Sequence, residues 1–242
     1  MIHQIDNNRQ SSSATIIVCT GDVILDVPEP DHWLGGIAPA LRKANLTLGH
    51  LEVPHSSAGF EQSTDIPAPG ADPEHLAALS RAGFDVMTLA GNHIGDCGAQ
   101  GIADTLSGLD ALDIKHCGAG MNLTSSRSPA LFAIDTRQLA VLSYNCVGPE
   151  SGWASDCKPG CAYLPVATAD GGPVAPAKIL SAPQTLAMEI LQQDISVARK
   201  QAALVIVALH KGIVHTPAVI ADYELVLARA AIDAGADIVI GH

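Results

Sequence analysis

Short aliphatic runs that each end on a polar residue constrain this chain more than any other feature of its sequence. Such runs occupy residues 15–20, 84–90 and 203–209, and a last one, ADIVIGH, fills residues 236–242. Their β-branched and aliphatic residues, bounded by glycine, are typical of strands that are buried on both faces. The runs therefore predict sheets that are covered from both sides.

Helical segments separate most of these runs. Residues 72–83 begin with Asp72, which suits an N-cap, and Pro73, which suits the first helical position. They end on Gly83, which suits a helix end. Further helices are predicted at 35–44, 98–113, 186–202 and 220–235, further strands at 45–52 and 114–118, a hairpin at 130–145, and little regular structure at 147–183. The alternation of strands and helices predicts an α/β or layered α+β protein. We find neither an internal repeat nor a linker that would divide it.

Composition limits the classes of partner. With 48% hydrophobic and 16% charged residues the chain can build a core, and with 3% aromatics that core must be aliphatic. The formal net charge of -12 argues against nucleic-acid binding, because no basic stripe is present to neutralise phosphates. We therefore expect a small-molecule substrate, no nucleic-acid partner and no membrane span, and self-association into a homo-oligomer stays open.

The N-terminal segment and the cysteines bear on the compartment. Residues 1–14 are polar and lack the apolar stretch of a secretion signal, so we expect them to form a disordered leader. Six cysteines without such a signal are most simply free thiols, and the Cys157 and Cys161 pair has no second pair to make a metal site. These features predict a cytoplasmic protein.

Five apolar runs end on residues that can bind metal. Asp22 follows the first run, Glu52 the second, Asn92 and His93 the third, and His210 and His242 end the last two. In open α/β sheets, ligands collect beyond the carboxyl ends of strands. Carboxylate, carboxamide and imidazole groups suit divalent Mn, Fe or Zn, and the absence of thiolates from these ends argues against a closed structural zinc site. The pattern predicts one or two divalent metal ions, which would activate water.

Five sequence blocks resemble, in order, the motifs of the capsule-synthesis CapA family, which is involved in poly-γ-glutamate synthesis. The blocks are GDVIL (21–25), GHLEVP (49–54), residues 82–120, ALHKG (208–212) and AIDAGADIVIGH (231–242). That family is similar to calcineurin-like metallophosphoesterases, whose fold is a four-layer α/β/β/α sandwich with a metal site at the strand ends. The resemblance thus implies a single domain over residues 15–242.

The resemblance also implies a role for each matching residue. Metal ligands are implied at Asp22, Glu52, Asn92, His210 and His242. His93 matches the histidine that acts as acid or protects the leaving group. Asn92 and His93 are adjacent at a strand end and must point in different directions, so one can bind metal while the other faces the substrate. We read Asp96 as a supporting residue rather than a ligand.

Three departures from the family pattern concern the site. His50 stands where the family commonly has Asn, and could ligate metal or contact substrate. Lys211 stands where Trp is frequent, and could bind a carboxylate or phosphate or be only a solvated cation; His215 is a further candidate for lining the pocket. The family continues past Gly-His into a further histidine, so the resemblance implies a domain that is truncated at its C-terminal end and lacks part of its second sheet.

These residues predict a soluble metal-dependent hydrolase. Metal ions would activate water, His93 would be the general acid, and His50, Lys211 and His215 would bind a small polar substrate. The bond could be a phosphoester or a cyclic amide, lactone or γ-glutamyl bond. The alternative is a non-catalytic accessory protein of poly-γ-glutamate biosynthesis or export.

Overall fold

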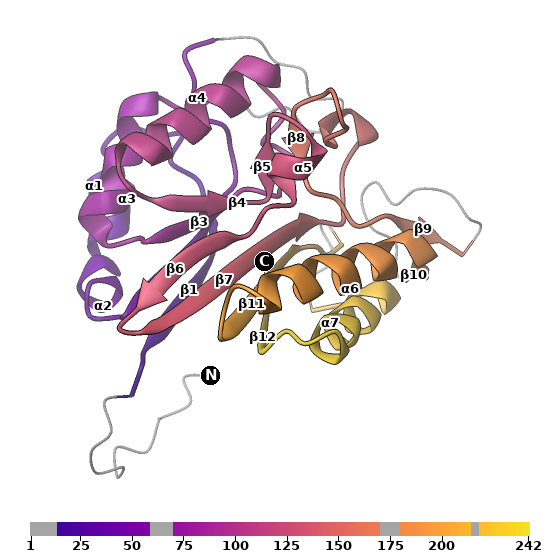
Figure 1. Ribbon diagram of the computed structural model, residues 1–242. Coiled ribbons are helices and arrows are strands. Elements are labelled where there is room, and N and C mark those ends of the chain that lie inside the picture. The colour runs from indigo at the N-terminus through magenta and orange to yellow at the C-terminus, as the bar shows by residue number, and fades with distance from the viewer. Residues whose placement is uncertain (1–13, 59–69, 170–179, 214–217) are drawn as a thin grey trace.

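A computed structural model describes residues 14–58, 70–169, 180–213 and 218–242 of the chain (Figure 1). Except for Ala14, the expected leader over residues 1–14 lies outside the described residues, and so does His215. Among the helices of the described residues, none has both the length and the apolar character that crossing a membrane requires.

The first sheet has four parallel strands in the order β1-β2-β3-β4. Its strands are β1 (Ile17–Val23), β2 (Leu46–Leu51), β3 (Val86–Thr88) and β4 (Lys115–Cys117). All residues of β2 are buried, as expected for a central strand, whereas most of β1 is partly or fully exposed at the edge. The pairing of β1 with β2 shifts between Cys19 and Asp22, and this irregularity places Asp22 opposite His50.

The second sheet has the order β12-β11-β7-β6. Its strands are β6 (Ala130–Ile134), β7 (Arg137–Asn145), β11 (Leu204–His210) and β12 (Ile238–Gly241). Strands β7, β11 and β12 are parallel, and β6 and β7 form the predicted antiparallel hairpin. Two small antiparallel pairs accompany the large sheets: β5 (Ala119–Gly120) with β8 (Gly160–Cys161), and β9 (Val166–Thr168) with β10 (Ser181–Pro183).

Helices cover one face of each large sheet (Figure 1). The first sheet is covered by α1 (Pro30–Gly35), α2 (Ala38–Leu41), α3 (Ala77–Ala82) and α4 (Gly98–Ala111). The second is covered by α6 (Thr185–Arg199) and α7 (Asp222–Asp233), and the short helix α5 (Leu123–Ser126) lies beside β5 and β8. The mixture of helices with several sheets confirms the predicted α+β class, whereas the specific four-layer sandwich stays a prediction.

A third apolar cluster joins the two large sheets. Leu48 and Val86 of the first sheet pack in one cluster with Val141 and Ile206 of the second. Neighbouring residues in β7 and β11 point the other way and pack against α6 and α7. Because successive side chains of a strand alternate between its faces, both faces of these strands are buried. This explains why the strands read as continuous apolar runs.

Some predicted elements differ from the observed ones. The single helix expected at 35–44 is two short helices, because Gly36 caps α1 and Pro39 can only stand in the first turn of a new helix. The helix expected at 72–83 begins as a 3-10 turn, η1 (Pro73–Leu76), with Asp72 as the predicted cap, and it ends as predicted at Gly83, which adopts the left-handed conformation. The segment 147–183, expected to be irregular, contains β8, β9, β10 and the 3-10 turn η2 (Glu150–Gly152), which are too short to leave a periodic pattern.

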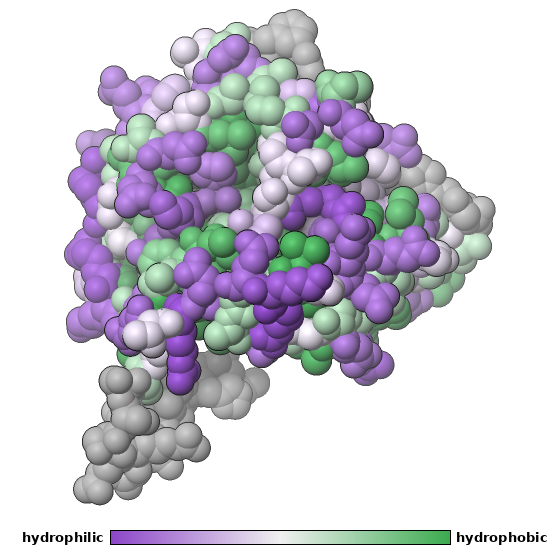
Figure 2. Space-filling view, in the orientation of Figure 1, coloured by the Kyte–Doolittle hydropathy of each residue, from purple (hydrophilic) through white to green (hydrophobic). Residues whose placement is uncertain are grey.

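The surface is mixed in character. Figure 2 shows hydrophilic residues over much of one face, with hydrophobic residues between them. Trp33, Ile220 and Leu180 are among the large apolar residues that are more than half exposed. Scattered exposed apolar residues are normal on a folded domain and by themselves indicate no partner.

The contact between the sheets can be tested by removing one of its side chains. We expect Ile206→Ala, at a residue that is 0% exposed, to lower the free energy of unfolding by about 2–5 kcal/mol, because it leaves a cavity between the sheets. Ile232→Ala, at a residue that is 48% exposed on α7, should change it by less than about 0.5 kcal/mol. Urea unfolding of both variants measures the difference, and equal values would contradict the packing described.

Candidate metal centre

The C-terminal ends of parallel strands from both sheets meet at one site. Asp22 lies in β1 and His50 in β2, and Glu52 follows β2 directly. His210 is the last residue of β11, and His242 follows β12. The structure therefore brings together side chains that the sequence places at separate strand ends, as predicted from the carboxyl-edge rule.

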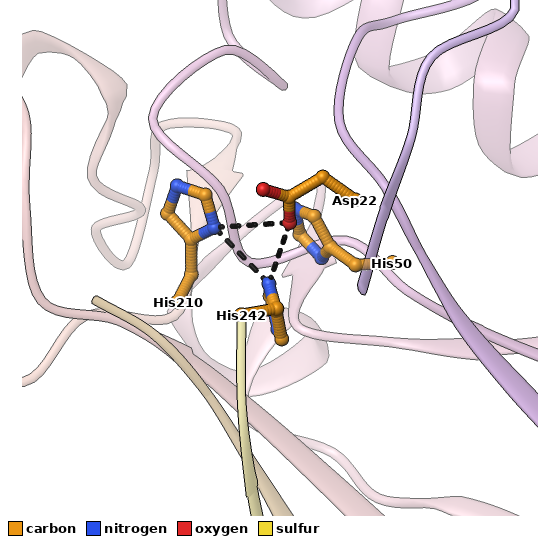
Figure 3. Close-up of side chains that lie close together, drawn as sticks. All are labelled: Asp22, His50, His210 and His242. Carbon is orange, nitrogen blue, oxygen red and sulfur yellow. Dashed lines mark hydrogen bonds and ion pairs between the residues drawn. The ribbon is translucent and has the colours of Figure 1, made fainter. Parts of the chain in front are cut away.

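Four side chains form a compact cluster (Figure 3). Asp22, His50, His210 and His242 each offer one ligand atom, and these atoms lie within 4.8 Å of one another. The Nδ1 atom of His242 is 3.0 Å from Oδ1 of Asp22 and 3.2 Å from Nδ1 of His210. The His50 ring stacks on that of His242 with centroids 4.1 Å apart. Imidazole and carboxylate groups in this arrangement suit a divalent ion of the first transition row.

Glu52 and Asn92 adjoin this cluster from two sides. The Oε2 atom of Glu52 is 3.1 Å from Nε2 of His50 and 3.8 Å from Nδ1 of His210. The Oδ1 atom of Asn92 accepts a hydrogen bond of 2.8 Å from Nε2 of His210. Asn92 thus contacts the nitrogen of His210 on the side of the ring opposite to Nδ1, which faces Asp22 and His242.

Three buried polar atoms of this site have no hydrogen-bond partner among the described residues. They are Nε2 of His50, Oε2 of Glu52 and Nε2 of His242. His50 and Glu52 are within ion-pair distance, but their alignment does not make a hydrogen bond. Buried polar atoms without partners are costly, so several of them in one place indicate a group that the polypeptide alone does not supply. A cation fits, because Oε2 and an unprotonated ring nitrogen are both electron-pair donors.

Burial sets the protonation of the histidines. Burial holds the pKa of His50 well below its ordinary value, and the neighbouring His242 lowers it further. Burial, with His50 next in effect, lowers the pKa of His210 to about 3. Both rings are therefore neutral at pH 7, which is the form that binds metal.

The site shifts the pKa values of its two carboxylates, Glu52 and Asp22, in opposite directions. Burial raises the pKa of Glu52. Burial also acts to raise the pKa of Asp22, but the hydrogen bond from His242 and the nearby imidazoles outweigh it, so that this pKa is lowered. Asp22 is thus the carboxylate that stays ionised most readily in the cluster.

The loop after β3 carries Gly91, Asn92 and His93. A Cβ atom at Gly91 would lie 2.7 Å from Nε2 of His50, so this position requires glycine for space rather than for a left-handed backbone. Nδ1 of His93 is 2.7 Å from Oδ2 of Asp96, which is buried. Asp96 therefore orients the His93 ring, and its supporting role in the site stays a prediction.

Lys211 makes a contact that the sequence does not reveal. Its ammonium group pairs with the buried carboxylate of Glu224, in the first turn of α7. The backbone N–H of Lys211 also donates to the carbonyl of His242. These contacts fasten the end of β11 to α7 and β12, and the substrate-binding role of Lys211 stays a prediction.

Thr88 is a site residue that sequence reasoning missed. Its hydroxyl is 3.1 Å from Nδ1 of His50 and 3.2 Å from the carbonyl oxygen of Gly49. The one available signal is a second polar residue, after Asp85, in the largely apolar run FDVMTLA. A threonine is common in strands, so this signal is weak.

The space requirement at Gly91 gives a testable consequence. We expect Gly91→Ala to lower the free energy of unfolding by about 1–3 kcal/mol, because the added Cβ must displace the His50 ring. Gly36→Ala, at a helical backbone position with no atom within 4 Å, should leave stability unchanged or raise it by less than about 1 kcal/mol. Guanidinium unfolding distinguishes them; a Gly91→Ala variant as stable as Gly36→Ala would disprove the contact.

The buried histidines predict a pH dependence for the ion-free protein. His55, which is outside the cluster, also has its pKa lowered by burial, to about 4. The pKa of such a residue is about 6.5 in the unfolded chain, so below that pH the unfolded state binds protons that the folded state does not. Stability is therefore full above about pH 6.5 and falls toward pH 4, by about 1.4 kcal/mol per pH unit for each such histidine.

Urea unfolding in chelator at several pH values measures this slope. The variant His55→Gln should show a shallower slope than the natural chain between pH 6 and pH 4, whereas His32→Gln, at an exposed histidine, should not. Identical slopes in all three proteins would show that His55 is not buried as a neutral ring.

Known proteins match most of this chain. Residues 15–242 match the model of a family described as bacterial capsule synthesis protein PGA_cap. A capsule biosynthesis protein CapA of Bacillus anthracis is 26% identical over 221 residues, which is 88% of this chain and 48% of that protein. A PGA biosynthesis protein CapA of Bacillus subtilis is 28% identical over 210 residues, 85% of this chain and 49% of that protein.

A shorter match covers one part of the chain. A Mycobacterium tuberculosis protein described as "Probable polyglutamine synthesis accessory protein" is 31% identical over 86 residues, which is 34% of this chain. The chain spans about half the length of the two CapA proteins. Because the family model matches almost all of the described chain, the protein belongs to the bacterial capsule synthesis protein PGA_cap family.

Proposed function

We propose that this chain is a metal-dependent hydrolase domain. The observation that carries the proposal is the cluster of Asp22, His210 and His242, in which His210 is buried, with the buried and unpartnered Oε2 atom of Glu52 beside it. The proposed ligands of one or two divalent ions (Mn, Fe or Zn) are Asp22, Glu52, Asn92, His210 and His242. A divalent ion held there supplies a Lewis acid and a water molecule with a lowered pKa.

The proposal includes the fold type. Helices cover the outer faces of two large sheets whose inner faces share one apolar cluster. We take this order as the four-layer α/β/β/α sandwich of metallophosphoesterase type. In such an arrangement the strand ends of both sheets open toward the same edge, where the cluster lies.

His93 is the proposed general acid. Its Nδ1 atom is held by Asp96, which fixes the ring and leaves Nε2 as the nitrogen for proton transfer. The ring is only partly buried, with 17% of its side chain exposed, so a substrate can reach it. Asn92, the preceding residue, points instead to His210. Of the two adjacent residues, Asn92 thus serves the ion site and His93 serves the substrate.

The proposed substrate is a small polar molecule with a phosphoester or with a cyclic amide, lactone or γ-glutamyl bond. The names of the two CapA relatives refer to capsule and PGA biosynthesis, which favours γ-glutamyl chemistry among these bonds. A non-catalytic accessory role in poly-γ-glutamate biosynthesis or export is the second candidate, and it is motivated by the word accessory in the description of the M. tuberculosis relative, a probable polyglutamine synthesis accessory protein. The alternative predicts a folded protein without turnover.

Two variants separate binding of the ion from catalysis. Metal analysis of the full chain is combined with hydrolysis assays on phosphodiesters, lactones, cyclic imides and γ-glutamyl peptides. We expect Asn92→Ala to reduce bound metal, because His210 loses its partner on Nε2. We expect His93→Ala to keep its metal and lose about 10²–10⁴-fold in turnover, as for removal of a general acid.

Asp104→Ala provides a control at a carboxylate outside the site, bonded to Ser56 and Gln100, and it should keep both metal and turnover. Natural protein that cannot be loaded with any divalent ion would exclude the hydrolase proposal. Protein that binds an ion yet hydrolyses none of these substrates would favour the accessory role. Full activity in both site variants would refute the residue assignment.

A further inference from the structure

We infer that His50 is itself a ligand of the ion, through Nε2, and that it makes the centre selective for a zinc-like ion. The inference rests on the proposed function, since it concerns the same site. It assigns to His50 a role different from substrate binding. Three features of the described residues support it: the hydrogen bonds of Thr88, the environment of Nε2, and the composition of the donor set.

Thr88 determines which nitrogen of His50 carries the proton. A hydroxyl has one hydrogen to donate, and the carbonyl oxygen of Gly49, at 3.2 Å, can only accept. The hydroxyl therefore donates to Gly49 and accepts from Nδ1–H of His50, which is 3.1 Å away. In a neutral ring with its proton on Nδ1, the lone pair is on Nε2. The ring thus presents an electron pair to the cluster.

The surroundings of Nε2 call for a cation. His50 is 0% exposed, and its Nε2 has no hydrogen-bond donor among the described residues. The nearest charged atom is Oε2 of Glu52, at 3.1 Å, which is also an electron-pair donor and also lacks a partner. Two such atoms repel each other when they are buried together, unless a positive charge lies between or beside them. A metal ion satisfies both at once.

A protonated His50 would not resolve this conflict. Its ring stacks against His242 at 4.1 Å and against His210 at 4.9 Å, and His50 is fully buried, so a positive ring would lose hydration and gain no aligned bond to Glu52. Gly91 also leaves open the space beside Nε2, where a larger residue would stand 2.7 Å away. The chain thus keeps Nε2 neutral and accessible to an ion.

The resulting donor set is three imidazoles and two carboxylates: His50, His210, His242 and Asp22, with Glu52 beside them. Imidazole nitrogen favours Zn²⁺ and related ions, whereas Mg²⁺ and Mn²⁺ prefer oxygen donors. Three imidazoles with carboxylate oxygen match the histidine and Asp or Glu ligands that zinc takes in proteins. His50 therefore shifts the metal-ion preference of the site toward Zn²⁺ and away from ions that prefer oxygen donors, such as Mg²⁺ and Mn²⁺.

The experiment measures ion binding rather than turnover. Zn²⁺ and Mn²⁺ affinities of the full chain are determined by competition with a chromogenic chelator, and the Co²⁺-loaded protein gives a visible absorption spectrum that reports its donors. The test variants are His50→Gln and Thr88→Val. Their matched controls are His55→Gln, at an equally buried histidine outside the cluster, and Thr47→Val, at a buried threonine of β2 whose hydroxyl donates to Leu41.

We expect the natural chain to bind one Zn²⁺ in this set, more tightly than Mn²⁺. Thr88→Val should lose about 10–100-fold in Zn²⁺ affinity, the usual cost of removing the partner that orients a metal-bound histidine. His50→Gln should lose more, should narrow the ratio of Zn²⁺ to Mn²⁺ affinity, and should change the Co²⁺ spectrum. Both controls should bind Zn²⁺ as the natural chain does.

Two results would overturn the inference, and they differ. A natural chain that binds none of these ions would refute both the proposed function and the role of His50. A natural chain that binds Zn²⁺, with His50→Gln showing the same affinity and the same Co²⁺ spectrum, would refute the role of His50 alone. Should His50→Gln fail to fold, an unchanged Zn²⁺ affinity in Thr88→Val would refute it equally.

Discussion

The apolar contact between the two large sheets is the constraint on which the rest of this structure depends. Leu46, Leu48 and Val86 from one sheet share a buried cluster with Val141 and Ile206 from the other. This contact holds the parallel strands of both sheets so that their C-terminal ends lie at a common edge. Residues far apart in the sequence, such as Asp22 and His242, meet there only because the sheets are held face to face.

The same burial creates the electrostatic conflict at the site. A domain buries polar atoms at a cost, and natural chains normally satisfy them with hydrogen bonds. Here the chain buries the imidazoles of His50 and His210 beside Glu52 and leaves electron pairs facing one another. Buried polar atoms without partners are typical of functional sites, because the free energy lost in burying them is recovered when a ligand binds to them.

Much of the fold followed from local pattern, and part of the site did as well. Strands such as β7 and β11 are apolar on both faces, so their runs could be recognised without knowing what covers them. Polar residues after those runs had to lie at the edge of a sheet, which placed Asp22, His210 and His242 near one another. Both inferences use only periodicity and the rule that parallel strands end together.

Side-chain direction could not be predicted in the same way. The cluster depends on the irregular pairing after Cys19, which turns Asp22 toward His50. The pairing of Lys211 depends on Glu224, a residue of a helix that starts eleven positions later, and the contact is invisible in the local pattern. Thr88 can be recognised as a site residue only from its contact with His50 on the neighbouring strand. Each of these depends on long-range geometry rather than on local composition.

The place of Asn92 bears on how many ions the site can hold. Its carboxamide oxygen contacts Nε2 of His210, whereas Nδ1 of the same ring faces Asp22 and His242. A single imidazole nitrogen has one lone pair, so an ion in the cluster and a group on the Asn92 side use different nitrogens of His210. With an ion on Nδ1, Nε2 keeps its proton and Asn92 orients the ring, as the outer partners of metal-bound histidines do. The present arrangement of His210 therefore favours one ion in the cluster, and Asn92 becomes a direct ligand only if its carboxamide leaves Nε2 of His210.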